Sequence, residues 1–277
     1  MKLLGANGWS RSALVALLYA AAAATLHADT IVATFDAAGV QSATDSALCG
    51  TSTHCWIGEE TFNAWNGTVP FTTTYSTSTP PDDVGGVTGG ISGTYTGTGL
   101  TESNNYMYGG AGGTGYYPTV TGSSYTLTLT STLKVGGQTE GVNYFGMWLS
   151  ALDADNELQF YDGTTLVYTF TAEQLIATMG ACPSSTNAFC GNPNNQEDAS
   201  EQFAFVNFYD ESGFFTKIVF SEADASGFES DNHTVGYLSS LVPIGTTFYT
   251  PEPDSLALLS LGTLALIWLR RRSSRGR

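Results

Sequence analysis

An alternation of apolar and polar side chains near the middle of the chain constrains the fold more than any other feature. Tyr125, Leu127 and Leu129 alternate with threonines, and Leu133 and Val135 continue the apolar face. Successive side chains of a strand point to opposite faces of its sheet, so this pattern predicts a half-buried β-strand and not a helix. A chain built on such segments is expected to fold as a β-sheet protein.

Turn signals divide the rest of the second half into further strands. Segments 157–161 and 164–170 flank Asp162-Gly163, and this pair predicts a hairpin because the turn requires positive φ. The other expected strands are 31–36, 142–151, 202–209, 215–221, 226–229 and 233–238. Strand 142–151 is expected to be central because both its faces are apolar. Strands 202–209 and 215–221 are expected to pair with each other. Eight or more antiparallel strands with little helix predict an all-β fold, an antiparallel β-sandwich of the jelly-roll kind.

One short helix is expected at about residues 172–178. Thr171 can cap its first turn, and Gln174 follows three residues later, as in a capping box. Leu175 and Ile176 would then turn inward toward the sheet.

Charge is sparse and unevenly distributed along the chain. Only 12% of the residues are charged, and most of the basic ones lie at the two ends. Between residues 29 and 250 the only basic residues are Lys134 and Lys217, and there are 23 acidic residues. This part therefore has a formal net charge of −21. Binding to phosphates needs a basic face, so nucleic acid is excluded as a partner of this part. Cations and neutral surfaces such as polysaccharide remain possible partners.

The first 28 residues have the three parts of a secretory signal peptide. Lys2 and Arg11 supply a positive region, and residues 13–24 form an apolar run too short to be a typical spanning helix. Leu26-His27-Ala28 approximates a cleavage site for signal peptidase, so we expect export through the Sec translocon and cleavage after Ala28. The alternative is an uncleaved membrane anchor.

The C-terminal region combines a short motif, an apolar run and a basic cluster. Pro251, Glu252 and Pro253 precede the apolar run 255–269, which is followed by Arg270, Arg271 and Arg272. The run is short for a bilayer that asks for about 17–25 residues, and the arginines are expected to stay on the cytoplasmic side. The chain would therefore touch the membrane only through this short transmembrane helix, with residues 29–250 outside the inner membrane. A plain C-terminal anchor is the simpler alternative.

This order of elements resembles the PEP-CTERM sorting signal of Gram-negative bacteria. The resemblance implies that residues 251–277 are recognised by exosortase, a membrane protease-transpeptidase, through Pro251, Glu252 and Pro253, and are cut near them. It also implies sorting from the inner membrane to the cell surface or extracellular matrix, usually in association with exopolysaccharide and biofilm. Residues 124–237 have a softer resemblance to the β-sandwich bodies of some exosortase-dependent surface proteins, from which no enzymatic activity carries over.

Four cysteines form two close pairs in polar stretches of the chain. An exported chain meets an oxidising compartment, so we expect the disulfides Cys49–Cys55 and Cys182–Cys190. Four cysteines allow three connectivities, which the sequence alone does not distinguish. The spacings of six and eight residues do not match those of zinc sites.

Two groups of oxygen side chains are candidates for calcium. Residues 153–157 place four such side chains in five positions, but the rest of an EF-type loop is missing, which favours a plain polar turn. Asp36 ends the first expected strand, while Glu229, Asp231 and Asn232 lie near the last one. In a jelly roll these two strands are often neighbours, so the four residues are a candidate structural calcium site, or else acids in solvent.

The glycine-rich segment 85–122 contains candidate ligand-binding aromatics. It holds 13 glycines and is expected to be a long loop or a set of short irregular strands. Tyr106, Tyr108, Tyr116 and Tyr117 are a candidate platform for sugar stacking, and the alternative is that they fill the core or the loop.

Catalysis has little support in the sequence. After removal of the signal peptide only His54 and His233 remain, and there is no G-x-S-x-G motif. Acid pairs for glycoside hydrolysis can be drawn from the many acids almost at will. We therefore expect an exported, non-catalytic structural or adhesive protein. The alternatives are a calcium-dependent carbohydrate-binding module and a hydrolase that acts on polysaccharide.

We expect the mature surface protein to lack residues 255–272. The two prolines hold the motif extended around the single carboxylate of Glu252, a form that a membrane protease can grip. Alanine at all three motif positions should leave the tail attached, whereas Pro243→Ala should not. Mass spectrometry of surface-exposed protein in the native host checks this. Intact tail peptides on wild-type protein, unchanged by deletion of exosortase, would show a plain anchor.

Overall fold

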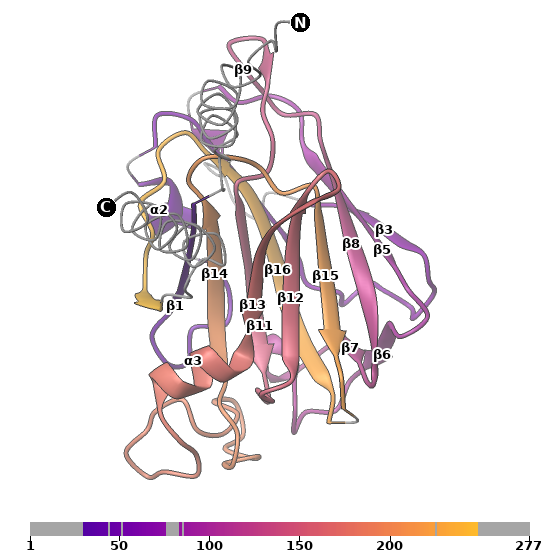
Figure 1. Ribbon diagram of the computed structural model, residues 1–277, viewed down its shortest axis with the longest axis vertical. Coiled ribbons are helices and arrows are strands. Elements are labelled where there is room, and N and C mark those ends of the chain that lie inside the picture. Colours follow the sequence, from indigo (N-terminus) through magenta and orange to yellow (C-terminus); the bar gives the residue numbers. More distant parts are fainter. Residues whose placement is uncertain are drawn as a thin grey trace, which may run out of the picture.

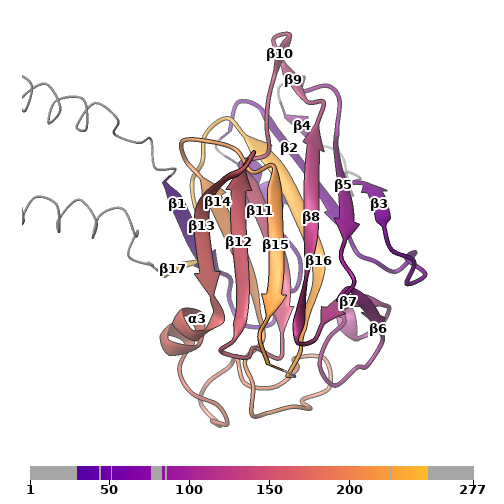
Figure 2. The same ribbon diagram turned by 45° about the vertical axis from the view of Figure 1, so that its right-hand side comes forward.

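The protein folds as a sandwich of two antiparallel β-sheets (Figure 1, Figure 2). The computed structural model describes residues 30–248, apart from 44, 51, 76–82, 85 and 225. The expected signal peptide and the expected sorting tail therefore lie outside the described residues. Within the described part, no helix is both long enough and apolar enough to span a bilayer.

The first sheet contains nine strands. In order across the sheet these are β17 (Thr246–Phe248), β1 (Ile31–Phe35), β14 (Ala204–Asp210), β11 (Tyr144–Ser150), β16 (Phe228–Leu238), β2 (Cys55–Glu60) and β4 (Asp83–Val84), while β7 (Tyr117–Val120) pairs with β16 and with β6 (Thr101–Ser103). The last strand of the described chain, β17, therefore lies beside the first.

The second sheet contains six strands and covers one face of the first. Its order is β13 (Thr165–Thr171), β12 (Asn156–Asp162), β15 (Lys217–Glu222), β8 (Ser123–Ser131), β5 (Ile91–Thr96) and β3 (Phe71–Thr74). The remaining elements are a small hairpin of β9 (Lys134–Val135) and β10 (Gln138–Thr139), the helices α2 (Asp45–Cys49) and α3 (Ala172–Met179), and the 3-10 turn η1 (Ala111–Gly113).

The alternating segment forms the strand that its pattern predicts. In β8 the side chains of Tyr125, Leu127 and Leu129 are buried in the core between the sheets, while the intervening threonines are exposed or half-buried. The strand ends at Ser131, and Leu133 returns to the same core after a short irregular stretch.

The central strand β11 is buried over its whole length, as its apolar sequence predicts. Phe145 and Met147 face the second sheet and join the main core. Tyr144 and Trp148 point to the other face, where Leu48 and Phe203 belong to two smaller clusters that cover them. The first sheet is therefore covered on both sides around β11.

The hairpin at Asp162-Gly163 is confirmed, with its turn one residue later than the pair suggests. Asp162 pairs with Thr165, so the two turn residues are Gly163 and Thr164. Gly163 has φ 56°, and a glycine with positive φ at the first turn position is what a type II′ turn requires.

Two details of the expected strand pairing are wrong. Strands β14 and β15 do not pair, because the connection 211–216 carries the chain from the first sheet to the second. Segments 226–229 and 233–238 are one strand, β16, in which the pairing with β11 shifts register between Gly146 and Trp148. Asn232 has φ 48° in this stretch. The crossings between sheets are typical of jelly-roll folds.

Helix α3 forms at the expected place without the expected cap. Thr171 has the extended backbone of an N-cap residue but no capping side-chain hydrogen bond. Leu175 is buried and Ile176 packs against the main core, so the helix is held by its apolar face. Both expected disulfides, Cys49–Cys55 and Cys182–Cys190, are formed.

A buried polar chain runs through the core around His233. The His233 Nδ1 atom lies 3.0 Å from the Tyr95 hydroxyl, which lies 2.7 Å from the Tyr75 hydroxyl, and the Nε2 atom lies 2.9 Å from Ser230 Oγ. The imidazole stacks on Phe220 with ring centroids 5.1 Å apart. Burial lowers the pKa of His233 to about 3, so the ring is neutral. His233 and Ser230 are fully buried, which makes this pair a part of the core.

We expect His233→Ala to lower the free energy of unfolding by about 3–5 kcal/mol. The substitution opens a cavity beside Phe220 and leaves the Tyr95 and Ser230 hydroxyls without their partner. Urea denaturation of the full chain measures the loss, with His54→Ala, a half-buried position outside this network, as the control. A loss below about 1 kcal/mol would show that the core does not depend on this chain of hydrogen bonds.

Candidate functional site

Three loops converge at the end of the sandwich where β11 finishes and β16 begins. We call this the loop end and define it by the segments 37–43, 104–116 and 180–203. The Tyr106 carbonyl accepts hydrogen bonds from the side-chain amides of Asn192 and Asn195, at 2.9 and 2.8 Å. The side-chain amide of Gln41 donates to the side-chain oxygen of Asn194 at 3.1 Å. These amides hold the glycine-rich loop 104–116 against the loop that follows the second disulfide.

Strand β16 fixes the same loop from the other side. The carboxylate of Asp231 accepts the backbone N–H of Ala111 at 2.8 Å through one oxygen and that of Asn232 at 2.7 Å through the other. The side-chain amide of Asn232 donates to the Gln41 carbonyl at 2.9 Å. Asp231 and Asn232, which the sequence offers as calcium ligands, therefore organise the backbone of the loop end.

Three of the four candidate tyrosines are exposed at the loop end. Tyr106, Tyr108 and Tyr116 are 53%, 38% and 39% exposed. Tyr117 is 1% exposed, so its expected place on a stacking platform is wrong. Its ring packs on Gly109, where a Cβ would overlap it, and its hydroxyl donates to the Asn105 carbonyl at 2.9 Å. Tyr117 fills the base of the loop that presents the other three.

A pocket of about 550 Å³ is lined by residues between Pro183 and Ala199, most of which lie in the segment closed by Cys182–Cys190. Its polar lining consists of Ser184, Ser185, Thr186, Asn187 and Gln196, and no charged side chain lines it. The amide of Asn187 donates to the carbonyls of Met179 and Gly180, both at 3.1 Å, and so ties the pocket wall to the end of α3. Such a pocket offers hydroxyl and amide groups to a neutral, polar ligand.

The loop end also carries buried carboxylates. Burial raises the pKa of Glu229 to about 8, and the nearby carboxylates of Asp153 and Glu222 add to the shift. Burial likewise raises the pKa of Glu201 to about 8, with a further contribution from its hydrogen bond to Asp198. For Asp231, burial raises the pKa to about 7. At neutral pH this cluster therefore holds protons that ordinary carboxylates have lost.

The expected calcium group of Asp36, Glu229, Asp231 and Asn232 is not assembled as proposed. Asp36 follows β1, while the other three lie on β16, with β14 and β11 between. The Asp36 N–H bonds Phe205 O, and Phe205, Trp148 and Asp231 lie opposite one another across the sheet. Three strand spacings, about 14 Å, therefore separate Asp36 from Asp231. β1 lies between β14 and β17, and the sequence did not reveal that β17 is the last described strand.

Residues 153–157 form the polar turn that was the alternative to a calcium loop. Asn156 is buried, accepts the Asp153 N–H at 3.0 Å and donates to the Gly227 carbonyl at 2.8 Å. Across the described residues, no three or more His, Cys, Asp or Glu side chains are grouped so that they could hold a metal ion.

Sequence reasoning missed the asparagines that shape the loop end. Asn192, Asn194 and Asn195 follow Cys190 closely, and short amide side chains of this kind bond nearby backbone in turns. That local signal was available in the sequence. Their hydrogen bonds to Tyr106 and Gln41 join segments that are 86 or more residues apart. No local pattern in the sequence predicts such contacts.

We expect the fold to lose stability as the pH rises from about 5 to about 8. Near pH 7 the folded chain holds a proton on Glu229 that the unfolded chain, with an ordinary carboxyl pKa of about 4.3, has lost. A raised acid pKa favours folding at lower pH: the contribution is full below about pH 4.3, falls as the pH rises, and is gone above about 8. Glu229→Gln should flatten the slope of Tm against pH by a few degrees over this range, and Asp162→Asn, an exposed hairpin position, should not. Equal slopes in all three proteins would contradict the shift.

The comparisons with known proteins concern the end of the chain. Residues 250–272 match the family model of the PEP-CTERM protein-sorting motif. No curated protein and no solved structure matches the chain. The match confirms the resemblance to the PEP-CTERM sorting signal. That resemblance rests on Pro251-Glu252-Pro253, the apolar run and the arginines. The chain therefore bears a PEP-CTERM sorting signal, and the protein is an exported exosortase substrate that is sorted to the cell surface.

Proposed function

We propose that the body of this surface protein is a non-catalytic binding module that attaches it to neutral exopolysaccharide, in an adhesive or structural role within a biofilm matrix. One observation carries the proposal. The uncharged pocket and the three exposed tyrosines belong to two loops that Asn192 and Asn195 join through the Tyr106 carbonyl, on a domain that is otherwise strongly acidic.

The charge of the domain narrows the ligand class. Residues 29–250 have a formal net charge of −21, so an anionic polymer would be repelled. A neutral polysaccharide meets no such barrier. Tyrosine rings offer flat apolar faces with a polar tip, and the Ser, Thr, Asn and Gln side chains of the pocket exchange hydrogen bonds with sugar hydroxyls.

The loop end is held in place before any ligand arrives. Asn192 and Asn195 fix the backbone at Tyr106, Asp231 fixes it at Ala111, and a disulfide closes the pocket segment. Ordering of loops opposes binding, and a loop that is already held loses less entropy when the ligand binds. This supports a binding role for the exposed tyrosines.

The direction of the last strand suits such a role. Thr246 pairs with Phe35 near the loop end, and Phe248 pairs with Ala33, so β17 runs away from the loop end. The sorting motif begins two residues later, at residue 250. In the proposed sequence of events the Sec translocon exports the chain, the tail holds the precursor at the inner membrane, and exosortase processing follows. The described chain ends at Phe248, on the part of β17 farther from the loop end.

We expect Tyr106→Ala, Tyr108→Ala and Tyr116→Ala each to weaken binding to neutral polysaccharide from the native host. Stacking of a sugar on an aromatic ring contributes about 1 kcal/mol, so each loss should be about fivefold. Affinity electrophoresis or calorimetry with the full chain measures it. Leu166→Ala is the matched control, because Leu166 is equally exposed but lies on β13, in the other sheet.

Two outcomes would contradict the proposal. Wild-type binding by the triple tyrosine variant would remove the loop end as the site. Release of new reducing ends from the polysaccharide by the wild-type protein, lost in Glu229→Gln, would show a hydrolase instead of a binding module.

A further inference from the structure

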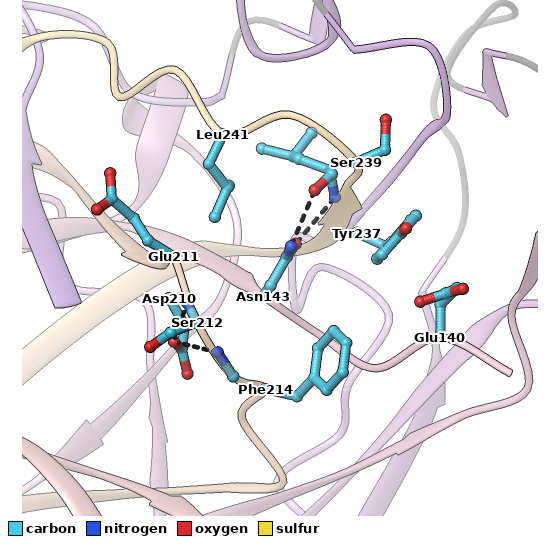
Figure 3. A pocket seen from close by; sticks show the side chains of 11 residues that line it. Glu140, Asn143, Asp210, Glu211, Ser212, Phe214, Tyr237, Ser239 and Leu241 are labelled. Carbon is cyan, nitrogen blue, oxygen red and sulfur yellow. Dashed lines mark hydrogen bonds between the residues drawn. The ribbon is translucent and has the colours of Figure 1, made fainter. Parts of the chain in front are cut away.

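A second pocket lies at the opposite end of the sandwich from the loop end, where β14 and β16 finish and β11 begins (Figure 3). It has a volume of about 370 Å³, within the range of small-molecule sites. At the other end of β11, Ser150 pairs with Glu229. The length of β11, about 20 Å, therefore separates this pocket from the site proposed above.

The floor of the pocket is built from backbone-bonded side chains. The Asn143 amide donates to the Leu238 carbonyl at 2.9 Å, and its oxygen accepts the Leu238 N–H at 2.8 Å. One carboxylate oxygen of the buried Asp210 accepts the N–H groups of Ser212 and Gly213 at 3.1 and 2.7 Å. Asn143 thus ties β11 to β16, and Asp210 shapes the loop that carries the pocket wall.

Two aromatic rings contribute to the walls. Phe214 is 37% exposed, yet its ring rests on Gly141, where a Cβ would overlap it. Tyr237 is half-buried and hydrogen-bonds Glu140, and burial together with that carboxylate raises the pKa of its hydroxyl. An exposed apolar ring that the backbone holds in position is a surface on which a ligand can stack.

The charged side chains that line the pocket are all acidic. Glu140, Asp210 and Glu211 contribute carboxyl groups, and none of the eleven residues that line it is Lys, Arg or His. Figure 3 shows Glu140 and Glu211 on opposite sides, with Asn143 and Phe214 between them. Carboxylates around aromatic faces attract a cation through charge and through the negative face of the ring.

We propose that this pocket binds a protonated hexosamine, a sugar unit that carries a primary ammonium group. The carboxylates of Glu140 and Glu211, which lie on opposite sides of the pocket, attract the ammonium, and the sugar ring rests on Phe214. Ser212 Oγ accepts the Thr30 N–H at 2.9 Å, which leaves the serine O–H to donate to a sugar hydroxyl. The site is independent of the neutral-polysaccharide site, and the two together would let one molecule bridge two chains.

Calorimetry on the full chain in detergent tests the proposal, with glucosamine, N-acetylglucosamine and glucose as probes. Glucosamine should bind, and the two neutral sugars should bind at least about tenfold more weakly, because they lack the charge-assisted hydrogen bonds. Added salt should weaken glucosamine binding. Similar affinities for all three sugars, or no binding of glucosamine, would overturn the proposal.

Matched variants separate the pocket from other acids of the surface. Glu211→Gln and Phe214→Ala change exposed positions and should each weaken glucosamine binding by about fivefold to tenfold. Glu173→Gln, an exposed acid on α3, should leave it unchanged. Unchanged binding in both pocket variants would place the amine elsewhere and overturn the assignment.

Two further outcomes are informative. Lysine amide bound as tightly as glucosamine would overturn the sugar as the occupant. The triple tyrosine variant of the loop end should keep its affinity for glucosamine. The two proposals can therefore fail independently: the tyrosine variants test the neutral-polysaccharide site, and glucosamine binding tests this pocket.

Discussion

The contact between the two sheets at Phe145 holds the rest of the structure in place. Phe145 lies on the central strand β11, with ring centroids within 6.1 Å of Phe160 and Phe220 in the second sheet and 5.5 Å from His233 on β16. Aromatic side chains supply large buried areas, and this cluster spans both sheets. Because β11 and β16 reach the loop end at one end of the sandwich and the second pocket at the other, the core fixes the strands on which both candidate sites are built.

The parts of the fold that the sequence predicts are those whose signal lies within a few neighbouring residues. The alternation at Tyr125 to Leu129 determines both the strand and its buried face, since a strand has a period of two. The Gly163 turn and the two short disulfide loops are local as well. The chain crossing between β14 and β15 was not predictable, because two adjacent apolar strands pair or cross according to contacts with distant segments.

The difference between local and long-range signals also explains which candidate site residues were predicted correctly. Tyr106, Tyr108, Tyr116 and Tyr117 look alike in a glycine-rich segment, and only the contact of Tyr117 with Gly109 and Asn105 separates it from the exposed three. A general rule for jelly rolls predicts that Asp36 lies near the last expected strand, whereas the strand order of this sheet places β14 and β11 between β1 and β16. The sorting motif can be recognised without the fold, because the continuous segment 250–272 carries it.

Hydrogen–deuterium exchange of the full chain, with and without the exopolysaccharide of the native host, tests the central claim most directly. The loop end is held by side-chain amides and is expected to be the surface that meets the polysaccharide. Binding there predicts slower exchange in 104–116 and 183–199, with little change along β17 and β1. Slower exchange confined to the β17–β1 edge, or none in either loop, would contradict the account.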